Sequence, residues 1–410
     1  MSIHEDLKAT MRIFARTNLT AALAHASTNL QISHSLRFKH RREIHTIRII
    51  PPPSDAHEAP LGIVSGSEDG TVMRLLYSSS QPEGSRVHSP GDICKHPGGR
   101  TVKALSVYKE SDLSYVLCAG GAKEVLLGFR LTWHNNEANC WDLRSTALVI
   151  PKPIDKAGTR AWTKGCGYVQ PRSESDQRIM DVVTYAYKGC MRVLYSTSLG
   201  AVSVVAMDEE QRTWRSVSNL EYHTCPVLVA DVLSSPNTTW ACTGGTDGSV
   251  AVWCLNDDIA IVPAYVINGA HQSGVNALSV AIAPHDTNVL IVVSGGDDQV
   301  LRVQSIDVTT DVLTASCVCA FDFAHSSAMR SIWTDGTQII STSVDQRVKI
   351  WEISYVSSTI DIHSRGGVAT QAPEPEAIDV VRASQDEESL TLVVAGRGFE
   401  LFTVKPINHA

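Results

Sequence analysis

The stretch "STSVDQRVKIW" at residues 341–351 repeats a pattern that occurs three more times in the chain. The other copies are "SGSEDGTVMRLL" at 65–76, "TGGTDGSVAVW" at 243–253 and "SGGDDQVLRV" at 294–303. Every copy places a hydroxyl side chain four residues before an aspartate. These pairs are Ser65 and Asp69, Thr243 and Asp247, Ser294 and Asp298, and Ser341 and Asp345. Such regularity indicates an internal structural repeat.

The repeat extends over most of the chain with a period of about 50 residues. Degenerate copies of the repeat, which lack the aspartate, occur at 116–129, 193–207 and 392–404, so the chain has seven units. Each unit is preceded by a further short apolar run rich in Val and Ile, and none shows a sustained helical period. These runs are 44–50, 101–108, 179–187, 225–233, 274–282, 328–333 and 377–384. Seven units of three or four short strands predict an all-β, seven-bladed β-propeller, because radial repetition leaves only short sheet edges.

The composition is that of an ordinary soluble protein. Of 410 residues, 43% are apolar and 19% charged, and the net charge of -8 gives no general attraction to nucleic acid or anionic membrane. The ten cysteines are scattered and lack the CxxC spacing of a zinc site, so we expect reduced thiols. No segment resembles a signal peptide or is apolar for long enough to span a bilayer. We therefore expect a cytoplasmic or nuclear protein without membrane insertion, most simply a cytoplasmic one.

The repeated aspartate has a predicted structural role. It lies in the tight turn between two strands, where a buried carboxylate needs hydrogen-bond donors. A tryptophan follows it by six residues in two copies, and a histidine precedes the unit. We expect these four side chains to form a network that locks each blade. The two full sets are His223, Thr243, Asp247, Trp253 and His325, Ser341, Asp345, Trp351; the partial sets are His271, Ser294, Asp298 with Gln304, and Ser65, Asp69 with Leu75.

These sets resemble the WD-repeat family, whose blades carry such a His, Ser/Thr, Asp and Trp network. In the first unit either His40 or His45 could take the histidine position. The only literal Trp-Asp pair, Trp141 and Asp142, lies about 18 residues after its turn, which places it outside the repeat position. We interpret it as part of an insertion.

The predicted domain organisation is simple. Residues 1–27 form an N-terminal extension with a possible short helix, residues 28–405 one propeller, and residues 406–410 a tail. An insertion spans about 132–178, with an outer strand near 146–150 and a loop that either binds a partner or is an idle surface excursion. Residues 29–38 supply the missing outer strand of the last blade and so close the ring.

A search for chemistry finds no nucleophile elbow, phosphate-binding loop, dinucleotide fingerprint, zinc-protease helix or calcium loop. The recurring histidines and aspartates belong to the predicted networks, and His40 with His45 lacks a third ligand. We therefore predict no enzyme activity, no metal and no cofactor. Positive charge is concentrated in "RFKHRREIHTIR" at 37–48, which can bind RNA phosphate or an acidic partner, or can be a solvated loop. These candidate binding residues are Arg37, Lys39, Arg41, Arg42 and Arg48.

Several phrases in order resemble the C-terminal propeller of the WD repeat-containing protein 6 family over about 37–405. They are "HRREIHTIR", "VKALSVY", "CAGGAKE", "GTDGSVAVW", "AHQSGVNALSV", "VSGGDDQ" and "STSVDQRVKIWEI". Members of that family are longer, with further propellers upstream, so this chain would correspond to their last part. The resemblance implies an adaptor that binds the catalytic subunit of a tRNA anticodon-loop 2′-O-ribose methyltransferase and helps to position tRNA.

Two other classes of function stay open at this point. A general protein-interaction scaffold, such as a ubiquitin-ligase substrate receptor or a trafficking adaptor, needs only the surface of the propeller. A propeller hydrolase or oxidoreductase needs acidic or metal-binding side chains that converge on the central channel.

Overall fold

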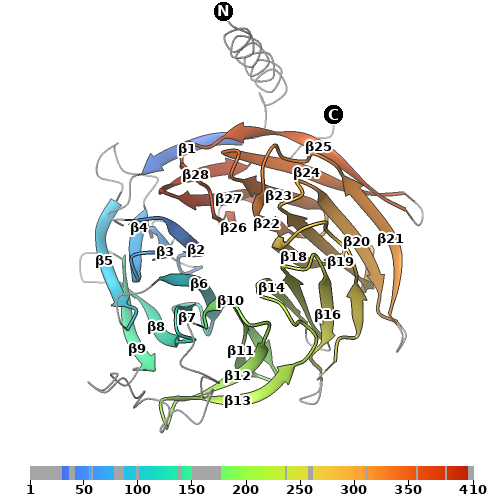
Figure 1. Cartoon of the computed structure of the whole chain (residues 1–410). Coiled ribbons are helices and arrows are strands. Elements are labelled where there is room, and N and C mark those ends of the chain that lie inside the picture. Colours follow the sequence, from blue (N-terminus) through green and yellow to red (C-terminus); the bar gives the residue numbers. More distant parts are fainter. Residues whose placement is uncertain are drawn as a thin grey trace, which may run out of the picture.

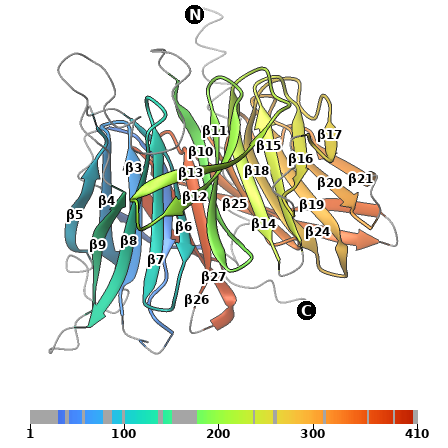
Figure 2. The same ribbon diagram turned by 90° about the horizontal axis from the view of Figure 1, so that it is seen from below.

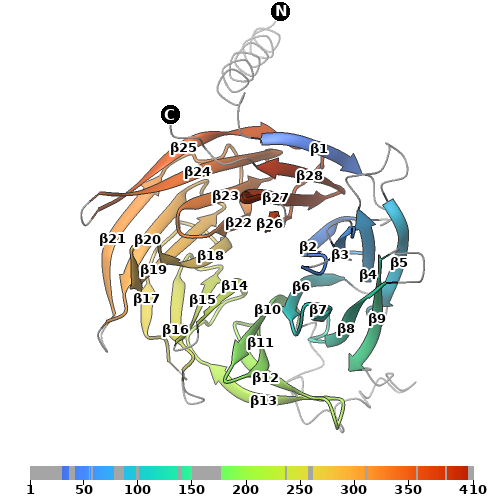
Figure 3. The same ribbon diagram turned by 180° about the vertical axis from the view of Figure 1, so that it is seen from behind.

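A computed structural model shows a ring of seven four-stranded antiparallel sheets, which confirms the predicted seven-bladed β-propeller (Figure 1). Figures 2 and 3 show the same ring after a 90° rotation and from behind. The structure describes residues 30–36, 42–54, 56, 59–77, 87–97, 101–135, 141–149, 177–235, 238–256, 262–309, 313–356, 359–383 and 386–404. Within these ranges every assigned element is a strand.

The four strands of each blade run in order from the channel to the rim. The innermost strands are β2 (Ile44–Ile50), β6 (Val102–Lys109), β10 (Ile179–Tyr187), β14 (Val227–Ser234), β18 (Val275–Ala283), β22 (Met329–Thr334) and β26 (Ala377–Ala383). The second strands are β3 (Leu61–Ser67), β7 (Ser114–Gly121), β11 (Cys190–Thr197), β15 (Thr239–Gly245), β19 (Asp286–Gly296), β23 (Gln338–Ser343) and β27 (Asp386–Gly396).

The outer half of each blade completes the sheet. The third strands are β4 (Thr71–Tyr77), β8 (Leu126–Asn135), β12 (Val202–Asp208), β16 (Val250–Cys254), β20 (Leu301–Asp307), β24 (Arg347–Val356) and β28 (Gly398–Val404). The rim strands are β5 (Val87–Lys95), β9 (Trp141–Val149), β13 (Thr213–Leu220), β17 (Tyr265–Ile267), β21 (Thr314–Phe321), β25 (Thr359–Ala369) and β1 (Leu30–Leu36).

The ring is closed by the first strand of the chain, as predicted. Strand β1 pairs antiparallel with β28, with Leu30 opposite Val404 and Leu36 opposite Phe399. Figure 1 shows β1 in blue beside the red strands of the last blade. The pairing gives the seventh blade its rim strand and removes the exposed edge of β28.

The hydrophobic core consists of slabs between neighbouring blades. One slab joins Ile47 and Ile63 of the first blade to Val393 and Leu401 of the last, and all four are almost fully buried. Each sheet is packed on both faces, which explains why runs such as "VLIVV" at 289–293 are continuously apolar instead of alternating. The core therefore depends on every blade having two neighbours.

The predicted insertion differs from the structure in its first part. Strands β8 and β9 form a hairpin up to Asn135 and from Trp141, so Trp141 and Asp142 lie in a rim strand. The hairpin extends this far because Leu131, Trp133 and Leu143 all point into the core. Residues 136–140 and 150–176 lie outside the described ranges. So do residues 1–29 and 405–410, and the extents proposed for the extension and the tail stay predictions.

Deletion of residues 1–36 should destabilise the propeller, because β28 loses its partner strand. We expect the free energy of unfolding to fall by about 3 kcal/mol or more, from lost ladder hydrogen bonds, together with self-association through the exposed edge. The matched control is deletion of residues 1–27, which keeps β1 and should change the free energy by less than about 0.5 kcal/mol. Urea denaturation and light scattering measure both, and equal behaviour of the two deletions would contradict the role of β1.

Candidate functional site

The repeated polar residues gather at one end of the ring, here called the turn face. It consists of the turns between second and third strands and the loops that enter each innermost strand. The turns are 68–70, 122–125, 198–201, 246–249, 297–300, 344–346 and 397. Since each aspartate lies in such a turn and each histidine in such a loop, the strand order brings them to the same end.

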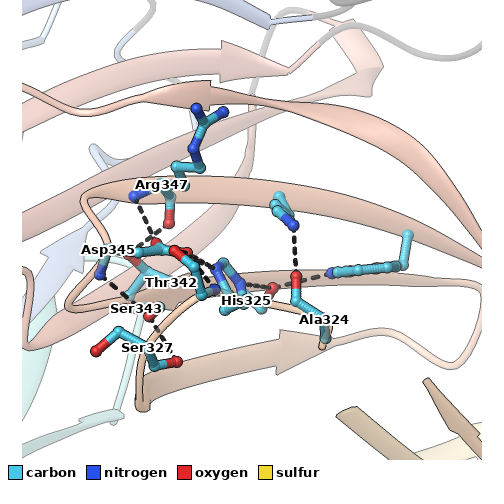
Figure 4. A network of polar contacts seen from close by, with 11 residues as sticks. Ala324, His325, Ser327, Thr342, Ser343, Asp345 and Arg347 are labelled. Atoms are coloured by element: carbon cyan, nitrogen blue, oxygen red, sulfur yellow. Dashed lines mark hydrogen bonds and ion pairs between the residues drawn. The ribbon is translucent and has the colours of Figure 1, made fainter. Parts of the chain in front are cut away.

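The sixth blade contains the full network (Figure 4). The ring of His325 is fully buried, and its Nδ1 lies 3.0 Å from Oδ2 of Asp345. Its Nε2 lies 2.8 Å from the hydroxyl of Ser341, which also accepts a hydrogen bond of 2.9 Å from Nε1 of Trp351. Backbone N–H groups of Ser326 and Arg347 complete the donors to Asp345. The network ties a loop, a turn and two strands into one unit.

The fifth blade has the same arrangement without the tryptophan. Nδ1 of His271 lies 2.9 Å from Oδ1 of Asp298, and Nε2 lies 2.9 Å from the hydroxyl of Ser294. Gln304 occupies the tryptophan position and is buried, and its Oε1 has no hydrogen-bond partner. The hydroxyl of Ser294 therefore lacks the tryptophan donor that the hydroxyl of Ser341 has in the sixth blade.

The fourth blade, which has the full set of residue types, is arranged differently. Nε2 of His223 lies 2.9 Å from the hydroxyl of Thr243, which accepts a 2.9 Å bond from Nε1 of Trp253. Asp247, however, accepts its hydrogen bonds from the backbone and side chain of Ser249 and from the thiol of Cys225. Nδ1 of His223 is buried without a partner. The direct contact between histidine and aspartate is absent from this blade.

The first blade retains only part of the pattern. Ser65 is fully buried, and Asp69 accepts hydrogen bonds from the backbone and hydroxyl of Thr71. His45 lies in the innermost strand β2 and lines the central channel, so it does not take the histidine position of a network. His40 lies outside the described residues.

Burial and hydrogen bonding act in opposite directions on the network acids. Burial alone would raise the pKa of Asp345, but the hydrogen bond and charge of His325 hold it below its usual value. The same balance lowers the pKa of Asp298 beside His271. Burial lowers the pKa of His271, against the effect of Asp298. These aspartates are thus maintained as charged acceptors inside the structure.

A second set of acids, not predicted from the sequence, joins neighbouring blades at the channel. Asp181 accepts a 2.9 Å bond from the backbone N–H of Ala230, and Asp231 accepts one of 2.9 Å from Val280. Asp379 accepts a 2.6 Å bond from the N–H of Ile49, across the junction between the last and first blades. Each links its own blade to the next.

The same role is taken by hydroxyl side chains in two other blades. Thr46 accepts a bond from the N–H of Leu105, and Ser106 accepts one from Thr184. The sequence signal for the acids was a single aspartate inside each of the apolar runs "IMDVV", "LVADV" and "AIDVV". From the sequence, these runs predict only strands.

Burial raises the pKa of all three channel acids. It raises that of Asp181 to about 6, although backbone N–H groups and the positive charge of Arg48 act in the opposite direction. The pKa values of Asp231 and Asp379 are also raised by burial and lowered by Arg48. Arg48 is therefore the common counter-charge of the three.

The central channel is a cavity of about 500 Å³ lined by residues of all seven innermost strands. Its other charged groups are paired: Glu376 lies 3.9 Å from Lys103 and 3.8 Å from Arg330. Burial and the charge of Lys103 lower the pKa of His45 to about 4. Nδ1 of His45 is buried in the channel without a hydrogen-bond partner.

The structure separates the residues of the basic segment. Arg48 lines the channel, whereas Arg42 is exposed on the turn face and lies 3.3 Å from Glu68. Arg37, Lys39 and Arg41 lie outside the described ranges. A shared binding surface for the five residues stays a prediction.

Comparisons with known proteins agree with this architecture. The family model "WD domain, G-beta repeat" matches residues 214–254 and 315–352, and each segment contains one complete His, Ser/Thr, Asp and Trp set. The chain is thus a propeller that carries WD repeats, a kind of protein that typically acts as a non-catalytic scaffold. No curated protein matches the sequence.

Solved structures with a similar fold include three proteins. They are the WD40 β-propeller domain of Doa1 at 16% identity, the WD40 repeats of RRP9 at 14% and U3-55K at 14%. Each has a TM-score of 0.54 and covers 92% of this chain, and the matches span 97%, 98% and 99% of the respective relatives. At these identities the likeness shows the fold alone.

In the described ranges no helix has the length and hydropathy to span a membrane.

Replacement of Asp345 by alanine should cost far more stability than the same change at Asp247. Asp345 is 5% exposed and its removal leaves His325 and two backbone N–H groups without their acceptor, a loss of about 2–4 kcal/mol. Asp247 is exposed and accepts bonds from Ser249 and from the thiol of Cys225, so we expect about 1 kcal/mol or less. Urea denaturation in chelator-treated buffer compares the two variants, and equal losses would refute the networks described above.

Asp181 should make the propeller less stable as pH rises. The unfolded carboxyl titrates near pH 3.9 and the folded one near 6, so the unfolded state binds fewer protons between these values. The free energy of unfolding should therefore fall by about 2–3 kcal/mol from pH 4 to pH 6.5 through this residue. Asp181→Asn lacks this titration. The difference in free energy of unfolding between the variant and the wild type should therefore shift by that amount in favour of the variant from pH 4 to pH 6.5. If the free energy of unfolding changes with pH in the same way in the wild type and in Asp181→Asn, burial does not raise the pKa of Asp181.

Proposed function

We propose that this chain is a non-catalytic cytoplasmic scaffold that binds other proteins through its turn face. The supporting observation is the use of its acids: the described network aspartates and channel aspartates accept hydrogen bonds from their own fold. Asp345, Asp181 and Asp231 thus act as structural acceptors within the fold. We therefore expect such a molecule to act by binding partners on its surface and not through a reactive centre.

The turn face presents apolar side chains that a partner protein could cover. Leu199, in the turn between β11 and β12, is 58% exposed, and Phe323, in the loop before β22, is 79% exposed. Phe323 has a φ of 55°, in the left-handed region that bulky residues rarely adopt. A depression of about 630 Å³ lies beside Leu199, with Glu124 and Tyr222 in its wall. Apolar anchors next to polar walls are typical of protein-binding surfaces.

A finer form of this proposal names the partner. The ordered phrases that resemble the WD repeat-containing protein 6 family support a role as accessory subunit of a tRNA anticodon-loop 2′-O-ribose methyltransferase. The exposed Arg42 on the turn face is the described residue that could contact tRNA phosphate or an acidic partner. In this form the chain would bind the catalytic subunit and help to position tRNA.

The test is co-purification with substitutions on opposite faces. The double variant Leu199→Asp, Phe323→Asp should recover its main partner at least about tenfold less than the wild type, because charge is placed on apolar anchors. The control is Val262→Asp, since Val262 is 70% exposed in a loop between third and fourth strands, at the other end of the ring. Equal recovery with all three chains would contradict the proposed face.

Deletion of the gene separates the two forms of the proposal. Recovery of a methyltransferase, with loss of 2′-O-methylation in the tRNA anticodon loop, supports the finer form. Recovery of another partner with unchanged tRNA methylation would exclude the methyltransferase role and leave the general scaffold. A substrate turned over by the purified chain alone would overturn both.

A further inference from the structure

The altered network of the fourth blade brings three metal-ligating side chains together. Nδ1 of His223, Sγ of Cys225 and a carboxylate oxygen of Asp247 all lie within 4.8 Å of one another. It is the one such group of histidine, cysteine and acidic residues in the described part of the chain. In a tetrahedral zinc site, bonds of about 2.0–2.3 Å place ligand atoms roughly 3.5 Å apart, so a small closure would suffice.

The orientation of His223 supports a ligand at this point. The residue is only 8% exposed, and its Nδ1 faces the other two side chains without a hydrogen-bond partner. Its Nε2 lies 2.9 Å from the hydroxyl of Thr243, so Nε2–H can donate there and leave the Nδ1 lone pair free. Ligating histidines usually hold their other ring nitrogen in this way.

The backbone also leaves room in front of the three atoms. A Cβ atom placed on Gly245 would lie 2.6 Å from Oδ1 of Asp247, 3.0 Å from Nδ1 of His223 and 3.1 Å from Sγ of Cys225. The three atoms therefore converge beside a position that only glycine leaves empty. Asp247 is exposed, so the space opens to solvent and an ion could enter.

The neighbouring blades show what the cysteine changes. Two residues after its histidine, the fifth blade has Ser273 and the sixth has Ser327, where the fourth has Cys225. In those blades Nδ1 of the histidine contacts the aspartate at 2.9–3.0 Å, whereas in the fourth blade it does not. The one blade that lacks this contact is the one of the three with a thiol beside it.

We propose that His223, Cys225 and Asp247 bind one Zn²⁺ ion, which joins the loop before β14 to the turn after β15. Thiolate, imidazole and carboxylate are the ligand types that zinc takes in proteins. Binding converts the Cys225 thiol to a zinc-bound thiolate and releases its proton to solvent. Water takes the fourth position on the open side. The ion thus replaces the missing histidine–aspartate hydrogen bond as the lock of this blade.

The experiment uses the full chain, freed of metal by dialysis against a chelator and titrated with Co²⁺ as a spectroscopic probe. The wild type should develop a thiolate-to-cobalt charge-transfer band in the near ultraviolet, saturating at about one equivalent. Zn²⁺ should displace the cobalt and raise the melting temperature. Asp247→Asn should keep the band, because the thiolate remains, and should weaken Zn²⁺ affinity, because a charged ligand is lost.

The matched variant is Cys225→Ser, which places in this blade the residue found in its two neighbours. It should fold and melt like the wild type in chelator, yet lose the band and the thermal shift by Zn²⁺. Cys190→Ser, at an exposed cysteine outside the site, should retain both. A band that persists in Cys225→Ser, or a wild type without a band, would overturn the zinc site.

Discussion

A carboxylate buried in a protein must be met by donors, and this requirement shapes the fifth and sixth blades and the links between several blades at the channel. In the sixth blade the donors to Asp345 come from a histidine that precedes the innermost strand and from backbone N–H groups on both sides of the turn. Because His325 also contacts Ser341, which accepts from Trp351, one acid orders four segments of the blade. The repeated sequence pattern, a hydroxyl residue four positions before an aspartate, reflects this arrangement.

The same chemistry holds the blades to one another. Asp181, Asp231 and Asp379 accept backbone N–H groups of the following blade, and Arg48 supplies their common counter-charge in the channel. A propeller blade buries both faces only against its neighbours, and these acids link the third blade to the fourth, the fourth to the fifth and the last to the first. The pairing of β1 with β28 completes the last blade. The acidic side chains of the channel, which could act as catalytic groups in an enzyme, are used here to hold neighbouring blades together. This use of the channel acids supports the proposal that the molecule acts through its surface.

Much of the fold could be predicted from the sequence, since a repeated phrase reports contacts within one unit. The strand expected at 44–50 is β2, and the closing role of 29–38 falls on β1. What depends on contacts between units was missed. Asp181 lies inside the run 179–187, which predicts only a strand, and Arg48 belongs to the basic run at 37–48, although strand β2 places it in the channel while Arg42 stays on the turn face. The convergence of Asp247 with His223 and Cys225 follows from the packing of the turn after β15 against the loop before β14.

The most direct measurement of the central claim is hydrogen exchange of the histidine ring protons by NMR. The account predicts slowly exchanging Nδ1–H signals for His271 and His325, since each donates to a buried aspartate, and their loss in Asp298→Ala and Asp345→Ala respectively. Rings that exchange rapidly with water in the folded wild type would show that the aspartates do not hold the blades together.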